Sequence, residues 1–168
     1  MISAHKILQR FFKFKRHRVK QNYKRILPVN ELFTDRWEKA RYLEFGKGTS
    51  IYDSSLVFGD VKVGKNTWIG PFTILDGSGG LSIGDNCSIS AGVQIYSHDS
   101  VKWAVSGGKE KYEYASVQIG NNCYIGPNVI IAKGIVLGDK CIIGANSFVN
   151  TSFSSCSRIA GNPARIIA

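Results

Sequence analysis

The sequence predicts an all-β fold, a parallel β-helix of about five triangular coils with an N-terminal helical arm and a short C-terminal cap. Three observations predict it. A large apolar residue recurs every six positions between Phe45 and Val149, with a two-residue slip after Leu75 and one interruption after Ile95, and Gly directly follows it in eight of the fifteen repeats. A period of six fits neither the 3.6-residue period of a helix nor the alternation of a hairpin strand. It fits short strands that each form one flat side of a coil and then turn a corner.

The repeat positions are predicted to point inward and to stack on those of neighbouring coils, with Gly relieving the backbone at the corners. Three repeats close one coil of 18 residues, and neighbouring coils pair as parallel strands about 4.8 Å apart. Residues 45–154 therefore form the repeat domain, and residues 1–44 and 155–168 are available to cap its open ends. The repeat positions are Phe45, Ile51, Val57, Val63, Ile69, Leu75, Ile83, Ile89, Ile95, Ile119, Ile125, Ile131, Leu137, Ile143 and Val149.

The formal charge of +10 comes almost entirely from the arm. Residues 1–25 hold nine Lys and Arg and no acid, whereas residues 26–168 hold 13 basic and 12 acidic residues. The body is therefore close to neutral, and its charge does not indicate a nucleic-acid partner. No apolar run approaches the roughly 18 residues of a spanning helix, and basic residues interrupt the apolar N-terminal positions. The sequence thus predicts a cytoplasmic protein without a signal peptide.

Four repeats toward the C-terminus share an aliphatic residue followed by Gly. They begin at Ile119, Ile125, Leu137 and Ile143, and the segment AGNPAR follows at residues 160–165. Together these features resemble the hexapeptide-repeat acyltransferases, in particular the maltose, galactoside and polysaccharide O-acetyltransferase branch. The resemblance implies a left-handed β-helix, which the periodicity alone does not give. It also implies acetyl-CoA as co-substrate, no permanently bound cofactor, and a homotrimer with active sites between protomers.

One interruption of the repeat is predicted to carry the chemistry. Residues 99–116 leave the coil as a loop, and His98 at its start is the only His of the repeat domain. A general base that works near neutral pH is most often His. The resemblance places the catalytic His at this loop. We therefore expect His98 to take the proton of an acceptor hydroxyl as it attacks the thioester of acetyl-CoA, unless His98 merely begins a polar loop.

Acceptor contacts are expected from three residues. Asp76 falls where the resemblance implies an acceptor-side aspartate, although an Asp that precedes Gly77 is equally typical of a turn. Trp68 and Tyr96 offer aromatic faces to a sugar, or pack within the fold. Where the maltose and galactoside enzymes usually carry an acceptor-binding Asn, this chain has Gly70. That departure favours a different glycan.

For the donor, the resemblance implies a CoA groove along the last two coils. Backbone contacts are expected there, and basic side chains are expected at the CoA phosphates. The backbone positions are Gly126, Ala132, Ala145 and Asn150, and the basic residues are Lys133, Arg158 and Arg165.

The cysteines predict no metal site. Cys87, Cys123, Cys141 and Cys156 form no CxxC pair and have no His cluster beside them, which argues against structural zinc. The first three lie four positions after a repeat residue and are predicted to be small buried side chains. A single His in the repeat domain also excludes the three-His metal site of the γ-class carbonic anhydrases, which share this fold.

The predicted function is an acetyl-CoA-dependent O-acetyltransferase that modifies a sugar hydroxyl of a glycan or polysaccharide precursor by direct transfer. The alternatives are N-acetylation of an amino-sugar nucleotide and, from another class, a non-catalytic β-helix scaffold. The scaffold would not account for His98, its loop or the AGNPAR segment.

The basic arm carries its own prediction. Leu8, Phe12, Val19 and Tyr23 fall near one helical stripe, interrupted by Lys15, with Lys and Arg over much of the remainder. Such a helix either packs on the body or a neighbouring protomer, or docks on an anionic membrane surface. Membrane contact would suit a lipid-linked glycan acceptor at the inner face of the membrane. Nucleic acid is the least favoured partner, because the body has no recognised binding motif.

Overall fold

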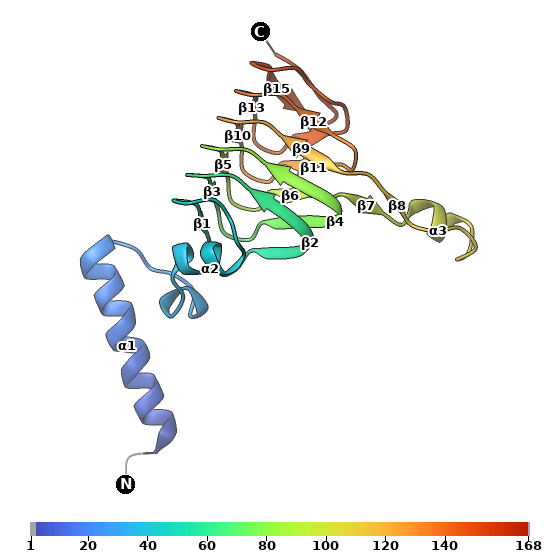
Figure 1. The fold of residues 1–168 in the computed structure, drawn as a ribbon. Helices are drawn as coiled ribbons and strands as arrows, with labels where there is room; N and C mark the ends of the chain where they lie inside the picture. The colour runs from blue at the N-terminus through green and yellow to red at the C-terminus, as the bar shows by residue number, and fades with distance from the viewer. Residues whose placement is uncertain (1–2, 168) are drawn as a thin grey trace. The chain divides into compact units, whose positions relative to one another are not determined.

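The computed structural model describes residues 3–167, and the chain divides into two compact units, residues 1–35 and 36–168. Helices α1 (Ala4–Tyr23), η1 (Asn30–Leu32), α2 (Arg36–Tyr42) and α3 (Val101–Val105) are drawn in Figure 1. The strands are β1 (Ser50–Ile51), β2 (Leu56–Val63), β3 (Trp68–Ile69), β4 (Ile74–Ile83), β5 (Ser88–Ile89), β6 (Gln94–Ile95), β7 (His98–Asp99), β8 (Glu113–Tyr114), β9 (Val117–Ile119), β10 (Tyr124–Ile125), β11 (Ile130–Ile131), β12 (Val136–Leu137), β13 (Ile142–Ile143), β14 (Phe148–Val149), β15 (Arg158–Gly161) and β16 (Ala164–Ile166).

The first unit is built on the α1 helix. The helix begins after Ser3, whose hydroxyl accepts a hydrogen bond from the Lys6 amide, and it ends at Lys24 in the left-handed conformation. The chain then returns through η1, and the ring of Phe33 packs against Phe11 and Phe12 with centroids 5.6 and 5.4 Å apart. No helix in residues 3–167 is long and apolar enough to cross a membrane.

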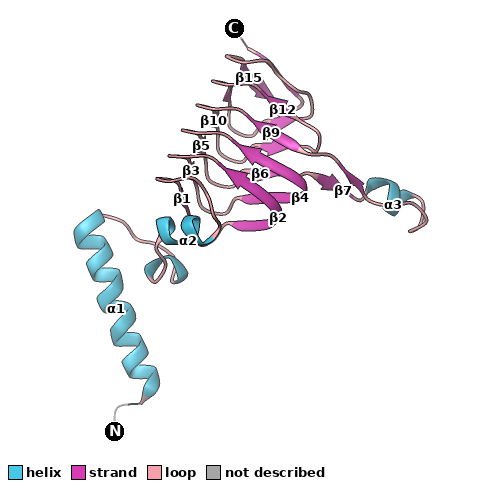
Figure 2. Cartoon of the chain, viewed as in Figure 1, coloured by secondary structure: helices cyan, strands magenta, loops and turns pink. Residues whose placement is uncertain are grey.

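The second unit is a stack of coils whose short strands pair in parallel, as Figure 2 shows. On the first side of the coils the strand order is β1-β3-β5-β10-β13-β15, extended by the antiparallel β16. The register on this side is 18 residues between β1 and β3 and between β10 and β13, as in Ile51 beside Ile69 and Ile125 beside Ile143. The predicted coil length is confirmed.

The other two sides of the prism form one sheet that folds around a corner. β4 is long enough to pass through this corner, pairing with β6 through Ile74 and Leu75 and with β9 through Leu81 to Ile83. β11 and β14 continue the β6 side, and β12 continues the β9 side. Between β2 and β4 the register shifts from 18 to 20 residues beyond Gly59. This shift is the structural form of the slip that the sequence shows between Leu75 and Ile83.

The interior of the prism consists of the predicted repeat residues. Most of them are fully buried, because each side chain enters a stack of equivalent side chains from the coils above and below it. Val57 is only partly buried, at the N-terminal end of the stack. The residues with 0% exposure include Ile51, Ile69, Leu75, Ile89, Ile95, Ile125, Ile131, Ile143 and Val149.

The glycines of the repeat act differently from the prediction that they relieve the backbone at the corners. The Gly residues that follow repeat positions do not adopt positive φ; they allow close approach of the next coil, and a Cβ on Gly126 would lie 2.7 Å from the Ala145 nitrogen. Asparagines supply much of the left-handed backbone, for example Asn122 at φ 59° and Asn146 at φ 58°. Asn tolerates this region better than other residues with a Cβ.

Helix α2 covers the first coil. Ala40 in this helix and Phe45 shortly after it belong to the buried core. Lys39 donates hydrogen bonds to the carbonyl oxygens of Tyr52, Asp53 and Ser55. A sheet end that lacks a further strand leaves such carbonyls unpaired. The Lys39 ammonium therefore satisfies part of this open end.

Candidate functional site

The irregular segments of successive coils lie next to one another at one corner of the prism. β4 turns this corner in residues 76–80, the next coil leaves it as the excursion 96–116 between β6 and β9, and the coil after that passes it at Lys133. The excursion projects from the coils as the β7–α3–β8 arm of Figure 1. The corner thus brings Asp76, His98 and Lys133 together from three coils.

His98 and Asp76 form a close pair. The Nδ1 atom of His98 lies 2.6 Å from Oδ2 of Asp76, whose side chain is 2% exposed, whereas the His98 side chain is 34% exposed. An ionised carboxylate only accepts hydrogen bonds, so Nδ1 donates and the lone pair of the neutral ring lies on Nε2. Nε2 has no hydrogen-bond partner among residues 3–167. The geometry is that of a His oriented by a buried acid.

Hydrogen bonds from neighbouring residues at this corner keep the Asp76 carboxylate ionised. Burial raises the pKa of Asp76, but hydrogen bonds from Ser78, Ser97 and His98 outweigh it and lower the pKa to about 2. The amides of Ser78 and Ser97 each donate at 2.9 Å. Gly79 is required in this turn, since a Cβ there would lie 2.4 Å from the Ser97 carbonyl oxygen. Asp76 is therefore ionised at neutral pH.

Ion pairs brace the excursion at its base. β7 and β8 pair in antiparallel fashion, with Asp99 opposite Glu113. Lys133, on the coil above, donates to Oδ2 of Asp99 in a short contact and to Oε2 of Glu113 at 3.3 Å, and Lys102 lies 2.6 Å from Glu113. The hydrogen bond from Lys133 lowers the pKa of Asp99. Lys133 thus connects β7, which carries His98, with its partner strand β8.

Aromatic rings of the excursion flank His98, and sequence reasoning did not select them. The ring centroids of Tyr112 and Tyr114 lie 6.4 and 5.7 Å from that of His98, with interplanar angles of 16° and 22°. Trp103 meets Tyr112 edge to face at 5.7 Å. All three aromatic side chains are more than 40% exposed. The sequence shows that Tyr112 and Tyr114 alternate around Glu113. It does not show that they lie beside His98, because this depends on the register of the β7–β8 hairpin.

The other expected acceptor residues lie elsewhere or are engaged. Trp68 belongs to β3, on another side of the prism, and packs edge to face on Tyr52 at 6.1 Å. Gly70 follows the same strand. Tyr96 lies at the corner below Ala132 and donates its hydroxyl hydrogen bond to Gln94 at 2.8 Å. Asp76 has both carboxylate oxygens bonded within the protein, so a direct acceptor contact would require breaking these bonds.

The residues expected at CoA fall on two corners and the C-terminal strands. Ala132 donates to the Val149 carbonyl and so lies beside Asn150, and Gly126 packs on Ala145 at the preceding corner. Arg158 lies on β15 and is exposed, and Arg165 on β16 donates to the Ala164 carbonyl at 2.7 Å. Lys133 is the exception, because its ammonium is engaged by two carboxylates instead of being free for a phosphate.

No group of three His, Cys, Asp or Glu side chains that could hold a metal ion occurs in the described residues. Cys87, Cys123 and Cys141 are buried free thiols, as the sequence predicts, and Cys156 is exposed. Burial raises the pKa of the Cys141 thiol, which disfavours the reactive thiolate.

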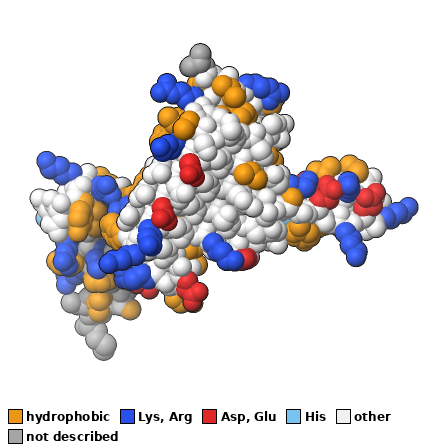
Figure 3. All heavy atoms as spheres, turned by 45° about the horizontal axis from the view of Figure 1, so that its top comes forward, with side chains coloured by type: hydrophobic (Ala, Val, Ile, Leu, Met, Phe, Trp, Pro, Cys, Tyr) orange, Lys and Arg blue, Asp and Glu red, His pale blue; other side chains and the backbone are white. Residues whose placement is uncertain are grey.

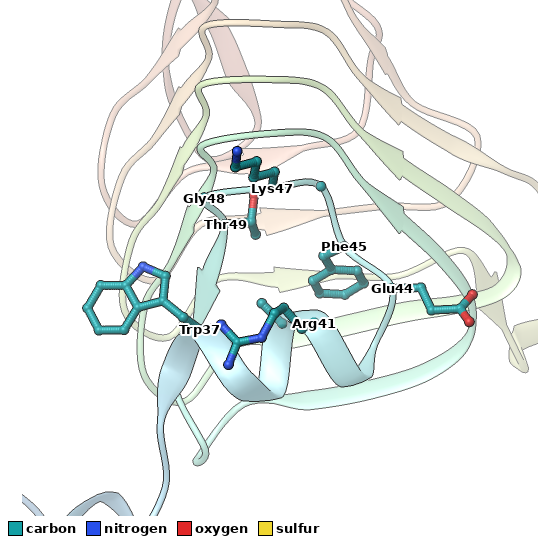
Figure 4. A pocket seen from close by; sticks show the side chains of 9 residues that line it. Trp37, Arg41, Glu44, Phe45, Lys47, Gly48 and Thr49 are labelled. Atoms are coloured by element: carbon teal, nitrogen blue, oxygen red, sulfur yellow. The ribbon is translucent and has the colours of Figure 1, made fainter.

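A separate pocket of about 470 Å³ lies where α2 joins the first coil. Figure 4 shows its lining side chains, with Phe45 at the coil and Trp37 and Arg41 from the helix. None of the residues predicted to bind acceptor or donor lines it. The residues predicted for catalysis lie away from this pocket, at the corner of His98.

Comparison with known proteins shows which families share these repeats. A family model described as bacterial transferase hexapeptide (six repeats) matches residues 116–151, and one described as hexapeptide repeat of succinyl-transferase matches residues 60–97. The two matches lie on either side of the excursion. The fold is that of the hexapeptide-repeat transferases.

The similar proteins include enzymes that transfer acyl groups. Galactoside O-acetyltransferase of Escherichia coli (strain K12) is 27% identical over 125 residues, which cover 62% of this chain and 62% of that protein. Galactoside acetyltransferase in complex with coenzyme A has a TM-score of 0.69 at 22% identity, covering 94% of this chain and 81% of that chain. AntD, an N-acyltransferase from Bacillus cereus in complex with dTDP and coenzyme A, has a TM-score of 0.66 at 20% identity, covering 78% and 87%.

These matches support the predicted resemblance to the hexapeptide-repeat acyltransferases. The structural likeness confirms the predicted left-handed parallel β-helix. The chain spans 62 to 63% of the length of the first curated relatives it matches.

Proposed function

We propose that the protein is an acetyl-CoA-dependent O-acetyltransferase that modifies a sugar hydroxyl of a glycan or polysaccharide precursor. The observation that carries this proposal is the 2.6 Å contact between His98 Nδ1 and the buried, ionised Asp76. The contact fixes the ring in the tautomer whose Nε2 can accept a proton, and the excursion holds that ring at the surface.

The proposed reaction is direct transfer with His98 as general base. Nε2 of His98 takes the proton of the acceptor hydroxyl while the oxygen attacks the thioester carbonyl carbon. A backbone N–H stabilises the oxyanion of the tetrahedral intermediate. The C–S bond then breaks, and the CoA thiolate receives the proton from His98. Asp76 stabilises the transient imidazolium and acts as a positioning residue instead of the acceptor ligand expected from the sequence.

The acceptor is proposed to lie along the aromatic rings beside His98. Tyr112 and Tyr114 offer exposed faces next to the reacting nitrogen, and such faces stack on the apolar face of a sugar ring. Tyr96 remains a candidate contact at the same corner. Trp68 is the weaker candidate, since it lies on another side of the prism.

The donor is proposed to lie along the corner of Ala132 and Asn150, above the excursion, with further backbone contacts at Gly126 and Ala145. Arg158 and Arg165 are the proposed phosphate contacts. This assignment rests on the family resemblance and on the stacking of these residues on adjacent coils. We further propose a cytoplasmic homotrimer with each site between two protomers, which light scattering would test.

N-acetylation of an amino sugar is the second candidate. AntD, with the same fold, is an N-acyltransferase, and Nε2 of His98 can equally accept a proton from an attacking amine. The product separates the two reactions, because an ester is released by mild alkali whereas an amide is not.

The test is acetyl-CoA turnover over a panel of sugar and amino-sugar acceptors, measured by release of the CoA thiol. We expect His98→Ala to lower turnover by roughly 10²- to 10⁴-fold, the usual contribution of a general base. His17→Ala, on α1, is the matched control and should leave turnover unchanged. If the wild type binds no CoA, or if His98→Ala keeps full activity, the proposal is wrong.

A further inference from the structure

Helix α1 presents an apolar face that stays largely exposed within its own compact unit. Ile7, Leu8, Phe11 and Phe14 are 58%, 53%, 44% and 59% exposed, and no residue of the helix is buried. At 100° per residue these four side chains share an arc of about 120° on the helix surface. Exposed large apolar residues that gather on one face indicate an interaction surface.

The opposite side of α1 is strongly basic. The helix carries seven Lys and Arg and no acid, and Lys24 and Arg25 follow it directly. Both hydrophobic and basic side chains cover this unit in Figure 3. The half of the helix that faces away from the apolar arc holds Lys6, Arg10, Lys13, Arg16 and Lys20.

Lys15, which interrupts the apolar stripe in the sequence, does not break the face. Its Nζ lies 5.7 Å from the ring centroid of Phe11 and 5.8 Å from that of Phe33, as in a cation–π contact. Phe12 is half-buried and packs edge to face on Phe33. The return segment therefore covers one flank of the helix and leaves the arc of Ile7 and Phe14 open.

We propose that α1 lies in the interface of an anionic lipid bilayer, with the arc of Ile7, Leu8, Phe11 and Phe14 inserted among the acyl chains. A helix of 20 residues is about 30 Å long and can lie flat in the interface. Its cations then face anionic head groups, so both faces of the helix have a partner. This inference does not depend on acyl transfer.

The charge distribution of α1 disfavours a second copy of the helix and nucleic acid as partners of this surface. Two copies of α1 that paired through their apolar arcs would leave the cations on the opposite side of each helix without a partner. Nucleic acid would neutralise the cations but leave the apolar arc in water. A bilayer that contains acidic lipids satisfies both features at once.

The experiment is co-sedimentation of the full chain with phosphatidylcholine vesicles that do or do not contain one quarter phosphatidylglycerol. We expect binding to the anionic vesicles that weakens with salt, and little binding to the neutral ones. Replacing three polar-side cations together, Lys6→Gln, Arg10→Gln and Lys20→Gln, should weaken binding roughly 100-fold, at about fivefold per cation. Phe14→Ser should weaken binding about tenfold.

Matched controls come from the β-helix. Lys47→Gln, Lys65→Gln and Lys140→Gln together remove the same charge, and Phe72→Ser removes an equally exposed ring; neither change should alter vesicle binding. Circular dichroism checks that the α1 variants keep their helix. The proposal is overturned if the wild type ignores anionic vesicles, or if the control triple weakens binding as much as the α1 triple.

Two further results would also overturn it. If Phe14→Ser leaves vesicle binding intact but lowers the oligomeric state in analytical ultracentrifugation, the arc is a contact between copies. If the wild type prefers duplex DNA to anionic vesicles at equal salt and Phe14→Ser binds both normally, the helix is a nucleic-acid arm.

Discussion

Asp76→Asn tests whether the buried acid acts through His98. In the wild type, Oδ1 accepts from the Ser78 amide, while Oδ2 accepts from the Ser97 amide and from His98 Nδ1. An amide group has one oxygen, so the variant must give up one set of these bonds. Ser78 is exposed, and water can replace its partner. We therefore expect the Asn side chain to keep its oxygen toward His98, which preserves the tautomer but removes the charge.

The magnitude follows from the change of a charged acceptor into a neutral one. A hydrogen bond to a charged group contributes about 1.5–3 kcal/mol and a neutral one about 0.5–1.5 kcal/mol. The loss is felt most when His98 carries the transferred proton, because the imidazolium then has no counter-charge. The difference, about 1–1.5 kcal/mol in the transition state, lowers turnover roughly 5- to 13-fold.

The assay is a double-mutant cycle on acetyl-CoA turnover. If Asp76 acts only through His98, Asp76→Asn in a His98→Ala background should change turnover by less than about twofold, and the KM for acetyl-CoA should stay constant throughout. Circular dichroism controls for folding. Equal effects of Asp76→Asn in both backgrounds, or a rise only in the acceptor KM, would refute the positioning role and restore the acceptor contact expected from the sequence.

Three further predictions test the brace, the acid and the core. Lys133→Met should lower kcat roughly tenfold with an unchanged KM for acetyl-CoA, because β7 and β8 lose the lysine that connects them. Lys133→Arg should recover most of the lost kcat. A raised KM for acetyl-CoA would instead support the phosphate contact. The pKa of Asp76 is lowered from 3.8 to about 2 by folding, so its contribution of about 2 kcal/mol is present above pH 3.8 and lost as the pH falls toward about 2; urea unfolding of the wild type should show this loss, and Asp76→Asn should lack it. Ile125→Ala, at a fully buried site, should cost about 2–5 kcal/mol of unfolding free energy, against less than about 1.5 kcal/mol for Ile130→Ala on the outer face of the next strand.

The coils could be predicted from the sequence because each repeat of six residues forms one side of a coil. A residue that enters the prism, such as Ile89, must be apolar, and its neighbours one coil away meet the same requirement. The same regularity predicted the buried Cys123. It did not predict why Gly126 is needed, because close approach of Ala145 is a contact between coils and not a property of the local backbone.

The candidate site was only partly predictable, because its contacts do not follow the coil register. Asp76 and His98 are 22 residues apart, whereas the residues that pair with this part of β4 are separated from it by 18 or 20 residues. The aromatic neighbours of His98 depend on a hairpin inside the excursion, and the partners of Lys133 lie on its two strands. The sequence marked His98 as unusual, but it could not show which acid holds it.

The position of the site follows from where the repeat fails. A perfect coil buries its inward side chains and offers only a flat, regular exterior, so it has no means of desolvating an acid or of holding a His at a fixed angle. The slip around Gly79 provides the turn whose Ser78 amide binds the Asp76 carboxylate, and the excursion provides the Ser97 amide and the strand that presents His98. Each departure alone would be a harmless loop. Because they fall at the same corner of adjacent coils, they form a buried charge with an exposed ring above it. Restoring the hexad period at residues 77–80 should therefore abolish transfer even though His98 and the core remain intact.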